Sequence, residues 1–285
     1  MECSAEAPAA GTVLNALATG TGSAFAIDRH VAASVEVTAG ESGVTGEVAG
    51  APDADTRLVE RCVELAGREF GDTELSGRVR TESEVPLASG LKSSSAAANA
   101  AVLATLDALG LAEAVTAEDA ARLGVRAARE VGVTVTGAFD DASASMLGGL
   151  TVTENDTDAL LVRDEVDWDV LVWTPPERAF SADADAERCR RVAPVAELVR
   201  ELALSGRYAE AMTVNGLAFC AALGFPAEPA VEALPDARGV SLSGTGPSYV
   251  AVGDRADLEA VEQRWRENEG NTWLTTTQTT GARTT

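Results

Sequence analysis

Lysine is nearly absent from this chain. Arginine supplies 21 of the 22 basic residues, and acidic residues number 45, which gives a formal charge of −23. A surface of this charge repels nucleic acids and anionic membranes, so neither is expected as a partner. An acidic surface with almost no lysine is typical of a halophilic protein from a high-salt cytoplasm, where salt screens the repulsion among carboxylates. An ordinary acidic protein is the alternative, and the lysine scarcity makes it the weaker one.

Cysteine and histidine are scarce as well. The four cysteines are far apart and form no Cys-x-x-Cys pair: Cys3, Cys62, Cys189 and Cys220. This spacing suits neither a zinc site nor a small disulfide framework, and it favours buried thiols in a reducing cytosol. The one histidine, His30, is expected to be structural or solvated, and a Ser-His-Asp hydrolase would have to be built around it alone.

The chain also lacks an apolar run of membrane-spanning length and the basic start of a signal peptide, so a cytoplasmic protein is expected. Its 285 residues, 46% of them hydrophobic, are enough for one large domain or two closely joined ones. There is no internal repeat and no linker rich in proline, glycine or serine. The composition therefore indicates a folded globular protein.

Hydrophobic periodicity predicts a mixture of strands and helices, which indicates an α+β fold. Strands are expected at residues 24–27, 32–38, 43–48, 75–83, 150–153, 160–162, 170–174, 240–243 and 248–252. Helices are expected at residues 55–70, 93–109, 116–131, 184–204, 206–223, 226–234 and 254–265. Gly40 and Gly43 suggest a hairpin-like turn between the second and third strands. Residues 271–285 read as a last strand followed by a loose tail.

The one lysine, Lys92, lies at the start of the helix expected from residue 93. The surrounding segment is Pro86, Leu87, Ala88, Ser89, Gly90, Leu91, Lys92, Ser93, Ser94, Ser95 and Ala96. A helix start offers unpaired N–H groups and a favourable dipole to an anion, and the serines add hydroxyls. Lysine adds a compact point charge that arginine does not reproduce. This combination predicts a phosphate-binding loop; an ordinary capped helix is the alternative.

The phosphate-binding loop is not of the Walker type. That pattern needs a glycine five residues before Gly90, where Val85 stands.

A second candidate site is the adjacent pair Asp140 and Asp141, which follows a glycine-containing connection. Adjacent carboxylates are costly if both are buried and ionised, so a metal, a cation or a raised pKa is expected at this pair. A carboxylate facing a hydroxyl is what phosphoryl transfer needs. Glu130 is a weaker candidate for binding Mg²⁺, and a solvent-exposed acidic turn is the alternative for the pair.

Two further glycine-rich turns each precede a strand and are ambiguous alone. They contain the substrate-side candidates Gly20, Thr21, Gly22, Gly244, Thr245 and Gly246. Together with the phosphate-binding loop, the second turn is a plausible wall of a nucleotide or substrate site.

These motifs together resemble the GHMP kinase superfamily. Its central motif, Pro-x-x-x-Gly-Leu-Gly-Ser-Ser-Ala, is matched at Pro86, Gly90, Leu91, Ser93 and Ser94. Lys92 replaces the usual glycine and Ser95 the usual alanine, and this form resembles the archaeal shikimate kinase branch. Three other segments agree in order along the chain: residues 15–22, 137–142 and 243–247.

The resemblance implies an N-terminal lobe like ribosomal protein S5 domain 2, residues 1–150, and a ferredoxin-like C-terminal lobe, residues 151–285. It implies Mg²⁺- and ATP-dependent phosphorylation of the 3-hydroxyl of shikimate. By position, the loop from Pro86 to Ala96 would bind the ATP phosphates, with Lys92 acting in catalysis. Ser94 would bind Mg²⁺, and Asp140 would face the acceptor hydroxyl as base or positioning group. Glu130 falls about one residue from the spacing of the family's metal-binding glutamate.

Other functions remain open on the sequence alone. Homoserine kinase and mevalonate kinase belong to the same superfamily, and the arginine that would hold an acceptor carboxylate is not evident. A nucleotide-binding regulatory protein without catalysis is a second alternative, and a structural or interaction protein is a third. Asp140 argues against the regulatory protein, and failure to bind Mg-ATP at high salt would favour the structural one.

Overall fold

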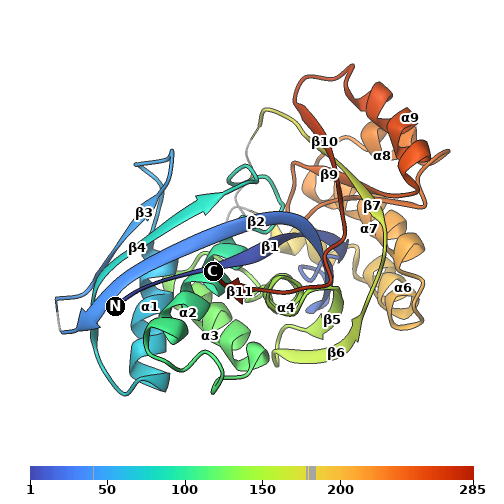
Figure 1. Cartoon of the computed structure of the whole chain (residues 1–285). Helices are drawn as coiled ribbons and strands as arrows, with labels where there is room; N and C mark the ends of the chain where they lie inside the picture. Colours follow the sequence, from blue (N-terminus) through green and yellow to red (C-terminus); the bar gives the residue numbers. More distant parts are fainter. Residues whose placement is uncertain (41, 178, 180–183) are drawn as a thin grey trace.

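The computed structural model describes residues 1–40, 42–177, 179 and 184–285, and it contains two sheets (Figure 1). The first sheet has the strand order β11-β1-β2-β4-β3, with β5 paired to β2 and β6 paired to β5. Its strands are β1 (Glu2–Leu14), β2 (Thr21–Ala39), β3 (Val44–Val48), β4 (Leu75–Ser83), β5 (Leu150–Glu154), β6 (Ala159–Asp164) and β11 (Arg283–Thr284). Because β2 is 19 residues long, it pairs with β1 and β4 and, near its start, with β5.

Four helices pack with the first sheet. They are α1 (Arg57–Phe70), α2 (Ser93–Ala108), α3 (Ala117–Val131) and α4 (Phe139–Leu147). The central helix α2 is buried around most of its circumference and consists largely of alanine. Alanine is the best helix former, and its small side chain lets the neighbouring backbone approach closely. The facing strand β1 is also rich in buried alanine, so the core beneath the phosphate-binding loop is tightly packed.

The second sheet has the order β10-β7-β9-β8 and is antiparallel throughout. Its strands are β7 (Asp169–Thr174), β8 (Gly239–Leu242), β9 (Tyr249–Gly253) and β10 (Asn271–Thr276). Its helices are α5 (Ala186–Arg190), α6 (Ala193–Leu204), α7 (Tyr208–Leu223), α8 (Glu228–Ala233) and α9 (Arg255–Trp265). If the four strands are numbered 1 to 4 in chain order, they lie side by side in the order 4-1-3-2. Helices follow strands 1 and 3. This is the ferredoxin-like arrangement, as expected.

Most elements expected from periodicity are present, and three expectations about the strands are wrong. Residues 24–27 and 32–38 belong to one strand, β2. The hairpin expected at Gly40 and Gly43 does not form, because β3 pairs in parallel with β4. The strand β1 was not expected, since alanine, proline and glycine are poor strand formers. Its pairing with β2 and its burial override that local preference.

Two expectations about the second half also need correction. The helix expected over residues 184–204 is divided into α5 and α6, with Pro194 in the first turn of α6. Strands β5 and β6 lie in the first sheet, so the chain passes to the second sheet after Asp164, beyond the boundary expected at residue 150.

The end of the chain is tied down rather than loose. The N–H of Gly149 donates to the carbonyl of Gln278, and the N–H of Ala282 donates to the carbonyl of Met146. Strand β11 then pairs with β1, and Arg283 forms an ion pair with Glu6. The chain thus returns from the second sheet to complete the first one (Figure 1). Within the described residues, none of the helices could span a bilayer.

Candidate active site

A cavity of about 970 Å³ collects most of the predicted site residues. The phosphate-binding loop lines it from Leu87 to Gly90 and from Lys92 to Ser95. The acidic pair Asp140 and Asp141 lines it from the start of α4. Residues of the second glycine-rich turn, Gly244 and Thr245, also contribute. The segments are more than 40 residues apart in sequence, so the fold itself creates the site.

The phosphate-binding loop has an unusual backbone. Ala88, Gly90 and Lys92 have φ values of 54°, 81° and 64°, in the left-handed region. At Gly90 a side chain would collide with the carbonyl oxygen of Ser243, so glycine is required there for space as well as for conformation. Non-glycine residues in this region are strained, and such strain persists where function requires it. Lys92 therefore occupies a backbone conformation better suited to glycine.

The second glycine-rich turn supports the phosphate-binding loop. The hydroxyl of Ser243 donates to the carbonyl of Gly90 over 2.9 Å, and the N–H of Ser248 donates to the carbonyl of Ser89 over 3.2 Å. The first-turn N–H groups of α2 have no carbonyl partner within their own helix. Because Ser93, Ser94 and Ser95 line the cavity, this end of α2 suits an anionic ligand.

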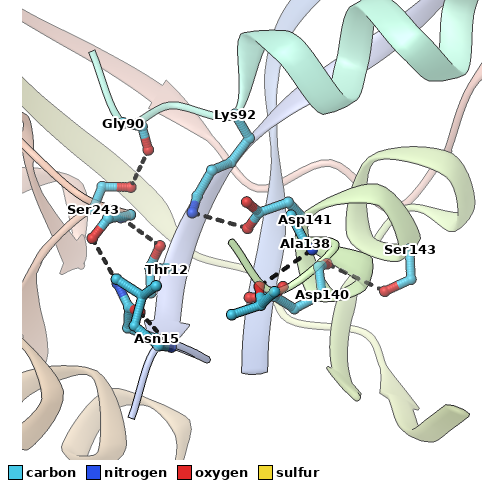
Figure 2. Close-up of polar contacts among 12 residues, drawn as sticks. Thr12, Asn15, Gly90, Lys92, Ala138, Asp140, Asp141, Ser143 and Ser243 are labelled. Carbon is cyan, nitrogen blue, oxygen red and sulfur yellow. Dashed lines mark hydrogen bonds and ion pairs between the residues drawn. The ribbon is translucent and has the colours of Figure 1, made fainter. Parts of the chain in front are cut away.

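Lys92 joins the two parts of the site. Its Nζ lies 2.8 Å from Oδ1 of Asp141, and the two side chains are 8% and 15% exposed. Figure 2 shows the ammonium group pointing from the loop toward the start of α4. An ion pair so little exposed is weakly screened by salt. It fixes the phosphate-binding loop relative to the acidic pair even at high ionic strength.

Asp140 is only 4% exposed. Its Oδ1 accepts a hydrogen bond of 2.8 Å from Nδ2 of Asn155. Burial, followed by the neighbouring charge of Asp141, raises the pKa of Asp140 to about 7, although Lys92 and Asn155 act in the opposite direction. A carboxyl group with this pKa exchanges a proton near neutral pH, as a general base must.

Gly22 on β2 gives Asp140 its space. A Cβ atom at this position would lie 2.5 Å from the carboxyl carbon of Asp140. Thr21 points elsewhere, since its hydroxyl donates to Glu154 over 3.2 Å. The first glycine-rich turn therefore lies against the carboxylate of Asp140, and its role is steric.

A buried polar network joins the first lobe to the second glycine-rich turn. The amide Nδ2 of Asn15 donates to the carbonyl of Gly244 over 2.7 Å, and the N–H of Gly244 donates to Oγ1 of Thr12 over 2.7 Å. The N–H of Asn15 donates to Oδ1 of Asn215 on α7 over 2.9 Å. The end of β1 thus holds the turn in place beside Lys92 (Figure 2).

Comparisons with known proteins identify the family of the chain. A family model described as "GHMP kinases N terminal domain" matches residues 57–149. A shikimate kinase of Halobacterium salinarum is 68% identical over 285 residues, which cover 100% of both chains. A shikimate kinase of Methanosarcina mazei is 51% identical over 276 residues, 96% of this chain and 93% of the relative.

The chain belongs to the GHMP kinase family, with the shikimate kinases as its relatives. It is a small-molecule kinase. The resemblance based on Lys92 and the serines that follow it is therefore confirmed.

Solved structures of this family share the fold. The homoserine kinase of Cytophaga hutchinsonii has a TM-score of 0.77 and 17% identity, covering 100% of this chain and 97% of its own. The mevalonate kinase of Methanococcus jannaschii has a TM-score of 0.73 and 12% identity, covering 97% of this chain and 98% of its own. The predicted α+β fold with the two GHMP lobes is thus confirmed.

Some predicted site residues of this GHMP kinase do not reach the cavity. Nε of Arg61 on α1 donates to Glu130 over 2.7 Å, and Glu130 does not line the cavity. Its metal-binding role stays a prediction that this position does not support. A side chain at Gly246 would meet the ring of Phe225, not the cavity. His30 lies beside Asp28 and Glu84, consistent with a structural role.

The cavity contains few cations. Among the described arginines, only Arg57 lines it, and that guanidinium donates to both oxygens of Asp55. Lys92 is the cation beside the acidic pair.

The structure also adds a residue that sequence reasoning missed, Asn155. It follows β5 in an acidic turn, and no motif spacing points to it.

Proposed function

We propose that this kinase transfers the γ-phosphoryl group of ATP to the 3-hydroxyl of shikimate, giving 3-phosphoshikimate and ADP. The observation that carries this proposal is the 68% identity, over the whole chain, to a protein named shikimate kinase. Threonines 134, 136 and 245 and the amide of Asn15 line the cavity, and such groups suit an acceptor with several hydroxyls.

The phosphate-binding loop would hold the nucleotide. N–H groups of the first turn of α2 and the ammonium group of Lys92 would neutralise charge on the β- and γ-phosphates. To reach a phosphate oxygen, Lys92 would share or leave Asp141, its partner at 2.8 Å. A lysine suits this exchange because its ammonium group is a movable point charge.

Asp140 would orient the acceptor hydroxyl in line with the γ-phosphorus. The acceptor oxygen then forms a bond to phosphorus while the bond from phosphorus to the β,γ-bridging oxygen breaks, and ADP leaves. The hydroxyl proton passes to the carboxylate of Asp140. Its raised pKa makes it a better proton acceptor than an exposed aspartate.

Mg²⁺ is the metal that the kinase family implies. The described residues hold no cluster of three or more acidic, cysteine or histidine side chains suited to a metal ion. Mg²⁺ needs few protein ligands, because substrate phosphates supply others. Ser94 lines the cavity and would be a ligand, and the ion would neutralise phosphate charge.

We also propose that the enzyme works in the cytoplasm of a salt-rich cell. Cys62, Cys189 and Cys220 are buried and unpaired, as expected in a reducing compartment. The charge of −23 supports partners that are small molecules, not nucleic acid or membrane.

A coupled assay of ADP release tests the acceptor. Shikimate, homoserine and mevalonate are compared at high salt with Mg-ATP, and NMR of the product identifies the phosphorylated hydroxyl. Turnover with shikimate at the 3-hydroxyl is expected, and Asp140→Ala should abolish it. Turnover only with homoserine or mevalonate would overturn the substrate, and ATP binding without turnover on any acceptor would indicate a regulatory protein.

A further inference from the structure

Asn155 is a fully buried side chain in the turn that follows β5. Its Nδ2 donates to Oδ1 of Asp140 over 2.8 Å and to Oγ1 of Thr136 over 3.3 Å. Its Oδ1 accepts from the N–H of Asp140 over 3.2 Å and from Oγ1 of Thr153 over 2.8 Å. Two donors and two acceptor sites are all that an asparagine side chain has, so every one is used.

These contacts fix the orientation of the amide. If its nitrogen and oxygen were exchanged, the oxygen would face the carboxylate of Asp140 and the nitrogen would face the N–H of the same residue. Both contacts would then be repulsive. Asn155 therefore holds Asp140 at two points, through the backbone N–H and through the carboxylate.

The other charged or neighbouring groups described around Asp140 do not take over this positioning role. Asp141 on the same helix adds a negative charge, and Lys92 from the phosphate-binding loop adds a positive one. Strand β2 contributes Gly22, which has no side chain, and the neighbouring Glu154 accepts from Thr21. Lys92 is shared with Asp141 and with any bound phosphate, whereas Asn155 has no competing ligand.

The turn that carries Asn155 is itself held in place. The N–H of Asn155 donates to the carbonyl of Gly20 over 2.9 Å. Nη2 of Arg129 donates to the carbonyl of Asn155 over 2.7 Å, and the same guanidinium binds both oxygens of Asp158 over 2.6 and 2.7 Å. A bidentate pair of this kind adds geometric precision. Helix α3 thus fixes the turn, and the turn fixes Asp140.

We propose that Asn155 is a positioning residue for phosphoryl transfer, holding the Asp140 carboxyl group in the orientation that meets the acceptor hydroxyl. The inference rests on the proposed role of Asp140. It also has an electrostatic side: the Asn155 donor favours the ionised carboxylate, so its loss disfavours the form that accepts a proton.

Two variants test the proposal, Asn155→Asp and Asn155→Ala. The first is isosteric and sets a carboxylate against Asp140; the second removes the donor. Asn99→Ala is the matched control, because Asn99 is also fully buried and its Nδ2 donates over 2.9 Å to the carbonyl of Ala142 on the same helix, α4. All three can lose stability, so melting temperature alone decides nothing.

The deciding measurement is the pH profile of kcat/KM for the acceptor. In the parent, we expect kcat/KM to fall as pH decreases and Asp140 becomes protonated. For both Asn155 variants we expect the midpoint of this fall to move to higher pH, by about one unit or more in Asn155→Asp. The kcat should fall by at least about tenfold, and the KM for ATP should stay within about threefold of the parent value. Asn99→Ala should keep the parental midpoint.

A parental midpoint and kcat in both Asn155 variants would overturn the inference, while loss of activity in Asp140→Ala would leave the proposed function standing. If the parent phosphorylates none of the acceptors, the proposed function fails instead. The ¹³C resonance of the Asp140 carboxyl group then decides, because it needs no turnover. A titration midpoint that rises in Asn155→Asp supports the contact, and an unchanged one overturns it.

Discussion

Replacing Asp140 with asparagine should make the folded protein more stable at alkaline pH, although it removes the proposed base. The reason is the cost of ionising a carboxyl group in a buried place. Burial and the charge of Asp141 raise the pKa of Asp140 to about 7 in the folded protein, from 3.8. The native state therefore binds more protons than the unfolded state between these two values, and stability falls as pH rises through this interval.

The magnitude follows from the size of the shift. About three pKa units at 1.36 kcal/mol each give a loss of roughly 4 kcal/mol, which is complete above pH 7 and absent below the unfolded pKa. The amide that replaces the carboxyl group would carry no charge and could still accept from Nδ2 of Asn155. At about 2 °C per kcal/mol for a chain of this size, Asp140→Asn should melt roughly 8 °C higher at pH 8.

Thermal unfolding of both proteins, followed by circular dichroism between pH 5 and pH 9 at constant high salt, measures this difference. The gain should shrink as pH falls below 7. Asp257→Asn, in the exposed first turn of α9, is the control, and it should change stability by no more than about 1 kcal/mol at any pH. An Asp140→Asn protein no more stable than the parent at pH 8, or a gain independent of pH, would refute the reasoning.

Four further substitutions, at three positions, probe the site. Gly22→Ala sets a methyl group 2.5 Å from the Asp140 carboxyl carbon, so kcat should fall about 100-fold while calorimetry finds unchanged ATP binding; a kcat within threefold of the parent contradicts this. Lys92→Gly should relieve about 1–2 kcal/mol of strain in the left-handed backbone of residue 92, and Lys92→Arg should keep the positive charge. Both variants should nevertheless lower kcat/KM for ATP by about 100-fold. Full activity in both would disprove the role of the ammonium group. Asn15→Ala removes the buried hydrogen bond from Nδ2 to the carbonyl of Gly244 and the one that Oδ1 accepts from the N–H of Leu17, and it should cost about 1–3 kcal/mol in urea unfolding; an unchanged midpoint would count against that network.

Local signals predicted much of the fold. Strand β4 matches the expected residues 75–83, and helix α3 begins after Thr116, whose side chain accepts from the N–H of Asp119 as expected for a cap. Strand β1 escaped prediction because its alanines, proline and glycine become a strand only through pairing with β2. Helix α4 escaped prediction as well, since the pair of aspartates in its first turn is equally typical of a loop.

The site, like the fold, was predicted only in part. Motif spacing identified Lys92 and Asp140, which line the cavity, because their chemistry is visible in the sequence. Asn155 holds Asp140, whereas Thr12 and Asn15 hold the second glycine-rich turn. Of these three supporting residues, only Asn15 fell in a recognised segment. A supporting contact depends on where the fold brings two distant side chains, and neither composition nor periodicity records that.

The return of the chain from β10 to β1 bears on the position of Asp140. Helix α4 carries Asp140 at its start, and its C-terminal end is tied to the returning segment, since the N–H of Ala282 donates to the carbonyl of Met146 and the N–H of Gly149 donates to the carbonyl of Gln278. The helix that carries the acidic pair is therefore anchored by a segment that comes from the second sheet. A substitution in residues 278–282 could disturb phosphoryl transfer without touching the cavity.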